Sequence, residues 1–138
     1  MVVELRTFSS IEEFIKSIDN DISRLKALLG DYLRRMENVK IKAESLLKFE
    51  ELLGKVAEGA PAGGREIDLG SVKVVVNPSP KQVLDTLVEV VRSIQDRITA
   101  LEKARKSLAI FEQVKEVVAD IEVVYKDGVP VTVIVRME

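Results

Sequence analysis

Apolar residues recur at alternating steps of four and three through the first half of the chain, and this heptad pattern constrains the fold more than any other feature. The pattern begins at Ile11 and runs through Leu25 and Tyr32 to Leu46, with charged and polar residues at most positions between. A period near 3.5 residues is typical of a helix that buries one continuous apolar seam. The pattern therefore predicts a coiled-coil helix from about residue 10 to about residue 57.

Capping residues mark where two helices begin. Ser10 is followed three residues later by Glu13, which is the spacing of a capping box. The sequence Ser79-Pro80-Lys81-Gln82 combines an N-cap serine, a proline in the first helical position and a glutamine in the third. We therefore expect a second coiled-coil helix over residues 80–119.

The segment between the helices predicts an antiparallel hairpin. Residues 58–64 are rich in glycine, alanine and proline, and residues 66–76 alternate like one strand with a bend at Gly70. Folding the second helix back onto the first buries both seams. With Ala57 opposite Pro80, residue i of the first helix then lies opposite residue 137 − i of the second.

Three further segments near the chain ends predict a small sheet. Residues 2–8, 121–126 and 129–136 alternate between apolar and polar, and Asp127-Gly128 is a preferred two-residue hairpin turn. A two-stranded hairpin alone is marginal in water, which favours pairing with the N-terminal strand.

These elements together predict an α+β fold that is predominantly α. We expect two long antiparallel coiled-coil helices, about 10–57 and 80–119, a strand at the tip (66–76) and the terminal sheet (2–8, 121–126, 129–136). The expected organisation is a single elongated domain, 1–138. It comprises a helical hairpin (9–119, with a tip segment 58–79), a terminal β-hairpin (120–138) and an N-terminal strand (1–8).

The apolar seams are wider than two helices require, and extra apolar flanks indicate additional neighbours. We therefore predict a homodimer or larger assembly. The flanking residues expected at its interface are Phe14, Leu28, Leu33, Leu47, Val83, Val88 and Val90.

The composition excludes much familiar chemistry. The chain has no His, Cys or Trp, which removes the usual zinc sites, Cys–His and Ser–His–Asp systems, haem ligands and disulfides. No spacing of the remaining Asp, Glu, Lys or Tyr residues indicates a catalytic pocket or a metal site. We expect a non-catalytic protein with no cofactor.

Charge and hydropathy indicate a compartment. The chain has 21 basic and 23 acidic residues and a formal net charge of −2, which gives no overall polyanion-binding character. It shows neither a basic segment followed by an apolar one at the N-terminus nor an apolar run long enough to cross a membrane. We expect a cytoplasmic protein without a membrane partner. The absence of Cys and the scarcity of Asn and Gln suggest a thermophilic source.

A local basic band is a candidate nucleic-acid contact. In the predicted hairpin register, basic residues of the two helices lie near one another, and the alternative is ordinary ion pairing with neighbouring acidic residues. No aromatic residue interleaves with them. The residues concerned are Arg34, Arg35, Lys40, Lys42, Lys103, Arg105 and Lys106.

The last strand is a candidate docking edge for another protein. Pro130 lacks a backbone N–H and favours an edge position. Exposed strand edges can accept an additional strand from a partner. The apolar residues expected at this edge are Val129, Val131, Val133 and Val135.

The order of long helix, β segment at Ile67–Val76 and long returning helix resembles that of prefoldin subunits, over roughly residues 11–118. The resemblance implies a holdase chaperone that grips unfolded clients. The chain departs from that family in having one expected strand between the helices, where prefoldins have β-hairpins, and in its terminal β structure.

We therefore expect a homo-oligomeric coiled-coil scaffold or adaptor that acts through protein–protein interaction. A prefoldin-like holdase and a nucleic-acid-associated protein are the alternatives. The expected partners are a second copy and another protein.

Overall fold

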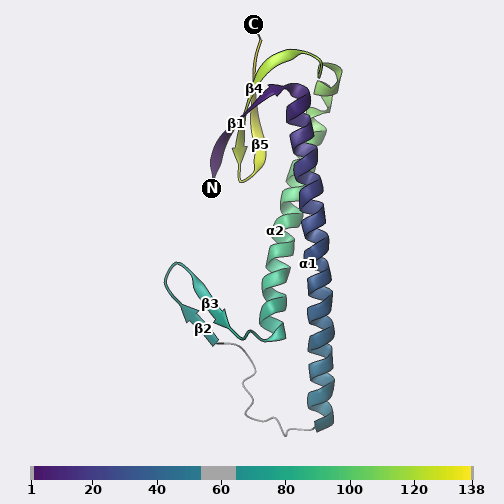
Figure 1. Ribbon diagram of the computed structural model, residues 1–138, viewed down its shortest axis with the longest axis vertical. Coiled ribbons are helices and arrows are strands. Elements are labelled where there is room, and N and C mark those ends of the chain that lie inside the picture. Colours follow the sequence, from purple (N-terminus) through teal and green to yellow (C-terminus); the bar gives the residue numbers. More distant parts are fainter. Residues whose placement is uncertain (1, 54–64, 138) are drawn as a thin grey trace. The chain divides into compact units, whose positions relative to one another are not determined.

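The computed structural model (Figure 1) describes residues 2–53 and 65–137. Internal contacts divide the chain into two compact units. The terminal unit comprises Met1–Leu29 and Ser93–Glu138, and the hairpin unit comprises Gly30–Arg92. The two long helices contribute residues to both units. The expected helix end near Ala57 and the connection 58–64 lie outside the described residues.

Both helices begin at the expected capping residues. Helix α1 spans Ile11–Leu53; the Ser10 hydroxyl accepts the Glu13 backbone N–H at 3.1 Å, and the Glu13 carboxylate accepts the Ser9 backbone N–H at 3.0 Å. Helix α2 spans Pro80–Ser107. Its capping box is reciprocal, because the Ser79 hydroxyl accepts the Gln82 N–H and the Gln82 side chain accepts the Ser79 N–H. Local sequence is sufficient to position both helix starts.

Helix α2 ends twelve residues before the expected residue 119. It stops at Ser107 and is followed by a 3₁₀ helix, η2 (Leu108–Gln113), and by strand β4, which begins at Val118. The register of the sheet explains the difference. Val118 pairs with Ser10 at the start of the strand, and Ala119 and Ile121 are buried, so Ala119 and Ile121 contribute to the sheet core as strand residues.

The terminal unit contains a three-stranded antiparallel sheet of β1 (Val3–Ser10), β4 (Val118–Lys126) and β5 (Val129–Arg136), in the order β1-β4-β5. Asp127 and Gly128 link β4 to β5 with φ angles of 51° and 81°. Two successive positive φ values are characteristic of the hairpin turn that an Asp-Gly pair favours.

The coiled-coil prediction is wrong. The first apolar residues of the heptad pattern, Ile11, Ile15 and Ile18, belong to a buried cluster with Ile121 and Val123 of the sheet. They therefore pack as a helix on a sheet. Beyond Leu25 no described side chain of α1 is buried, and Leu46 at the end of the pattern is 48% exposed. A heptad pattern specifies an apolar stripe, but the stripe does not specify which element covers it.

The two helices contact each other in the terminal unit in a different register from the expected one. Leu25 of α1 clusters with Ile98 and Leu101 of α2. The Lys26 ammonium lies 3.5 Å from the Glu102 carboxylate, whereas the predicted register places Phe111 opposite Lys26. The predicted register assumes that Ala57 lies opposite Pro80, and the observed contacts between α1 and α2 do not agree with that register.

The hairpin unit contains a β-hairpin where the sequence predicted one strand. Strands β2 (Arg65–Asp68) and β3 (Lys73–Val76) pair antiparallel, with Ile67 opposite Val74. Gly70 has a φ of 97°, and its N–H donates to the Asp68 carboxylate at 2.8 Å. The residue expected to bend one strand therefore reverses the chain, because glycine adopts positive φ at little cost.

Among the described residues, none of the helices has the length and apolar character needed to cross a membrane.

Candidate functional site

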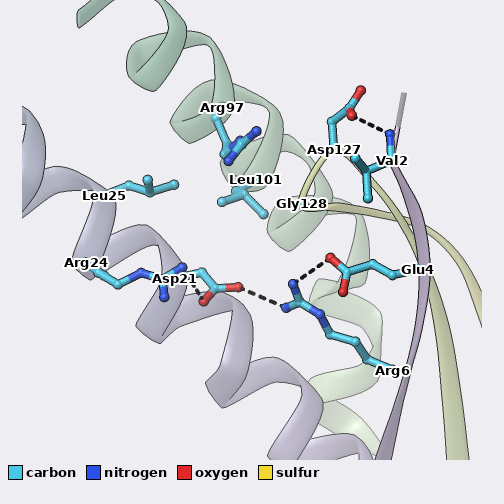
Figure 2. Close-up of a pocket in the computed structure, with 10 residues that line it drawn as sticks. All are labelled: Val2, Glu4, Arg6, Asp21, Arg24, Leu25, Arg97, Leu101, Asp127 and Gly128. Atoms are coloured by element: carbon cyan, nitrogen blue, oxygen red, sulfur yellow. Dashed lines mark hydrogen bonds and ion pairs between the residues drawn. The ribbon is translucent and has the colours of Figure 1, made fainter. Parts of the chain in front are cut away.

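Six charged side chains line one cavity of the terminal unit (Figure 2). Strand β1, both helices and the β4–β5 turn all contribute to its wall. The cavity measures about 280 Å³. Its lining residues are Val2, Glu4, Arg6, Asp21, Arg24, Leu25, Arg97, Leu101, Asp127 and Gly128.

The alternation of β1 directs two of these side chains toward the helices. Glu4 is opposite Tyr125 and Arg6 is opposite Val123 in the register with β4. Tyr125 and Val123 are both fully buried. Successive strand residues point to opposite faces, so Glu4 and Arg6 share the face that α1 covers.

A chain of ion pairs crosses the cavity from β1 to α1 (Figure 2). The Arg6 guanidinium lies 3.1 Å from the Glu4 carboxylate and 3.8 Å from the Asp21 carboxylate, and Asp21 lies 3.3 Å from Arg24. The hydrogen bond that Arg6 donates to the Glu4 carboxylate raises the pKa of Arg6, and partial burial opposes that increase. The network fastens the first strand to the first helix.

Tyr125 lies beneath this network. The Arg6 guanidinium carbon lies 4.1 Å from the centroid of the Tyr125 ring, within the range of a cation–π contact. The Tyr125 hydroxyl is buried without a hydrogen-bond partner of standard geometry among the described residues. Burial raises the pKa of this hydroxyl, although neighbouring Arg6 and Ser17 lower it in part.

The charges around the cavity balance one another. Three arginines face three carboxylates, and Asp127 also accepts the Val2 backbone N–H at 2.9 Å. Within residues 2–53 and 65–137, no group of three metal-ligating side chains is present. The cavity therefore has the character of a structural ion-pair network, which sequence reasoning missed because its members lie far apart in the chain.

The residues expected at an oligomer interface occupy different environments. Phe14 is fully buried, with its ring centroid 5.3 Å from that of Phe8, so its assignment to an intermolecular surface is wrong. The wide apolar flank at Phe14 is explained by the sheet of the same chain. Leu28, Leu33, Leu47 and Val88 are exposed, whereas Val83 and Val90 are half-buried.

The predicted basic band divides between the two units. Arg34, Arg35, Lys40 and Lys42 belong to the hairpin unit, whereas Lys103, Arg105 and Lys106 belong to the terminal unit.

Several of these basic residues have partners within the chain. Arg34 pairs with Asp31, and the Arg35 guanidinium lies 5.4 Å from the Tyr32 ring centroid. Arg105 contacts two carboxylates, Asp19 at 3.0 Å and Glu112 at 2.5 Å, and Glu112 raises the pKa of Arg105 most. Arg105 therefore connects α1, α2 and η2 through ion pairs. This agrees with the alternative interpretation of the basic band, in which its residues form ordinary ion pairs with neighbouring acidic residues.

The candidate docking edge is an edge strand, because among the described strands β5 pairs only with β4. Its pattern differs from the simple alternation of Val129, Val131, Val133 and Val135. Pro130 is opposite Tyr125 and Thr132 is opposite Val124, so Val131 is an extra residue in a bulge. Val133 packs against the core, whereas Val131 is 51% exposed.

Sequence reasoning also missed the β2–β3 hairpin. A signal was present, because apolar residues alternate on both sides of Asp68-Leu69-Gly70-Ser71, and such a segment can form a hairpin turn.

Comparisons with protein-family models, with curated proteins and with solved structures find no match to this chain.

Proposed function

We propose that this protein is a cytoplasmic, non-catalytic scaffold or adaptor that acts by binding a second copy of itself and another protein. One observation carries the proposal. Among the described residues of the hairpin unit, only Leu87 and Val91 are buried, while large apolar side chains of both helices and of the β2–β3 hairpin face solvent. The exposed ones are Leu33, Ile41, Leu46, Leu47, Phe49, Leu52, Ile67, Leu69, Val72, Val74, Val75, Val76 and Val88.

Leaving so many large apolar side chains exposed is energetically unfavourable in an isolated chain. Burial of apolar surface contributes roughly 25 cal/mol per Å², and large exposed apolar patches on soluble proteins mark binding surfaces. An adaptor makes the exposure useful, because the same residues become buried when the partner binds. Isolated two-stranded hairpins are marginal in water, so β2–β3 in particular gains from a partner.

The terminal unit offers a separate surface for a different protein. Strand β5 lies at an edge of the described sheet, and its Val131 and Val135 are exposed. Natural sheets often carry Lys at such an edge to block the pairing of another strand. We propose that a partner strand adds to this edge.

Affinity capture with a quantitative readout tests the adaptor function. Bait proteins with the native sequence, with Val131→Lys and with Ile110→Lys are compared in extract from the source cells. Ile110 is 69% exposed and lies in the same unit but outside the sheet, so Ile110→Lys is the matched control. We expect one stoichiometric partner with the native and control baits and its loss with Val131→Lys. Equal recovery with all three baits would reject the edge as the docking site.

A holdase function is the second candidate. The β2–β3 hairpin removes one departure from the prefoldin pattern, and exposed apolar side chains at that hairpin suit an unfolded client. Suppression of the aggregation of a chemically unfolded client at equimolar protein would support it. A client that aggregates at the same rate with excess protein would reject it.

A further inference from the structure

The β2–β3 hairpin has one mainly apolar face and one mainly polar face. Ile67 and Val74 are opposite each other, and so are Glu66 and Val75, with Lys73 on the same side as Val75. Arg65, the partner of Val76, lies on the same face as Ile67, and alternation together with the Leu69–Val72 backbone hydrogen bond groups the apolar residues Ile67, Leu69, Val72, Val74 and Val76 there. All five are exposed, from 37% at Ile67 to 66% at Leu69.

The apolar face lies on the side of the hairpin opposite the first turns of α2. A cavity of about 510 Å³ separates the hairpin from α2, and its wall includes Glu66, Lys73 and Val75 together with Gln82 and Thr86. The hairpin residues in that wall all belong to the polar face. The face formed by Ile67, Leu69, Val72, Val74 and Val76 is therefore on the opposite side of the hairpin, and we name it the hairpin face.

The last turns of α1 carry a second uncovered surface in the same unit. Leu46, Phe49 and Leu52 follow one another at intervals of three, so they share one side of the helix. Their exposed fractions are 48%, 60% and 85%. We name these three residues the helix stripe. Apolar residues on such a stripe normally cover another layer of secondary structure.

We infer that the hairpin face of one copy packs on the helix stripe of a second copy, and that the hairpin face of the second copy packs on the helix stripe of the first, in a two-fold dimer. This inference rests on the proposed function. A sheet face and a helix stripe are the two surfaces that form a stable two-layer core. One chain exposes both surfaces. A two-fold exchange uses each of them once per copy and closes the assembly, because residue i contacts j and j contacts i.

The two surfaces together supply eight exposed apolar side chains per copy, five on the hairpin face and three on the helix stripe. The stabilisation from apolar burial grows with the area removed from water, so a partner that covers both surfaces binds more stably than one that covers either alone. A client that covered only the hairpin face would leave Phe49 and Leu52 in water, which favours a second copy as the occupant.

Single-cysteine cross-linking tests the reciprocal contact. The chain has no cysteine, so each variant carries one unique thiol and every disulfide must join two chains. Val74→Cys and Phe49→Cys proteins are mixed at equal concentration, oxidised mildly and mapped by mass spectrometry. We expect the mixed Val74–Phe49 cross-link to exceed each self-cross-link several-fold. Glu66→Cys on the polar face and Glu51→Cys on another side of α1 are the matched controls, and they should give no such excess.

Light scattering over a concentration series supplies a second readout. Val74→Lys and Phe49→Lys should each raise the protein concentration at which the dimer forms at least tenfold and leave the circular dichroism spectrum unchanged. Glu66→Gln should leave that concentration unchanged. A monomer at every concentration, or an excess of Val74–Val74 over mixed cross-links, would overturn the inference. If the dimer contact is absent but a partner is still captured at the β5 edge, the dimer inference is rejected and the adaptor function is still supported.

Discussion

The Arg6 guanidinium lies over the ring of Tyr125 at 4.1 Å and lies 3.8 Å from Asp21 of α1. One side chain of the first strand therefore covers the aromatic residue of the central strand and reaches the first helix. Substitution at Arg6 tests whether this contact stabilises the terminal unit.

We expect Arg6→Met to destabilise the protein by about 1 kcal/mol, because it removes a cation–π contact and two ion pairs while keeping the aliphatic packing. The free energy of unfolding in urea measures the effect. Arg24→Met is the control, since Arg24 is exposed and, within the described part of the chain, pairs only with Asp21. A similar loss in both variants would show that surface charge, and not the contact with Tyr125, is responsible.

Tyr125→Phe should be neutral or stabilising by up to about 1 kcal/mol. The Tyr125 hydroxyl is buried without a partner of standard geometry, and removing an unsatisfied buried group relieves its desolvation cost. Thermal and urea unfolding measure the change. A loss of more than about 1 kcal/mol would indicate that the hydroxyl forms a hydrogen bond in solution, with Ser17 as a candidate partner.

The same hydroxyl predicts a change at high pH. Burial raises the pKa of Tyr125 above its ordinary value of 10.0, so folding favours the neutral phenol. The associated stability is complete below the unfolded-state pKa and is lost as pH rises through the higher folded-state pKa. The native protein should therefore lose stability faster than Tyr125→Phe above pH 10. Parallel slopes of unfolding free energy against pH would contradict this prediction.

The sequence predicts both Phe14 and Leu33 at an oligomer interface, but in the structure Phe14 is buried and Leu33 is exposed. Phe14→Ala should cost about 3–5 kcal/mol, because Phe14 is fully buried and its removal leaves a cavity. Leu33→Ala should cost less than about 1 kcal/mol, since Leu33 is 44% exposed. Urea unfolding below the dimer dissociation concentration measures both. Equal small losses would place Phe14 outside the core.

Glu13 predicts an effect at low pH. Hydrogen bonds from the Ser9 hydroxyl and the Ser9 backbone N–H lower its pKa below 4.5. The stability that this carboxylate contributes is present above the unfolded-state pKa and is lost as pH falls through the lower folded-state pKa. Glu13→Gln should therefore flatten the acid limb of the stability profile. NMR titration of the Glu13 carboxyl measures the pKa directly, and a value above 4.5 would contradict the prediction.

Local sequence alone determined the features that depend on residues a few positions apart. Ser10 with Glu13 and Ser79 with Gln82 define where the helices begin, and Asp127-Gly128 defines the tight turn between β4 and β5. Each of these is a hydrogen bond or a backbone angle set by near neighbours. The pairing of the N-terminal strand with the last hairpin could also be anticipated, because alternation marks all three strands.

The tertiary structure decided which elements cover the apolar stripes. The heptad pattern could not reveal that Ile11, Phe14 and Ile18 pack on a sheet, since any apolar layer satisfies the same spacing. It also could not place Arg105 against Asp19, because that ion pair depends on the register between two helices. Short-range preferences are encoded in adjacent residues, whereas burial and ion pairing depend on chain segments that meet only after folding.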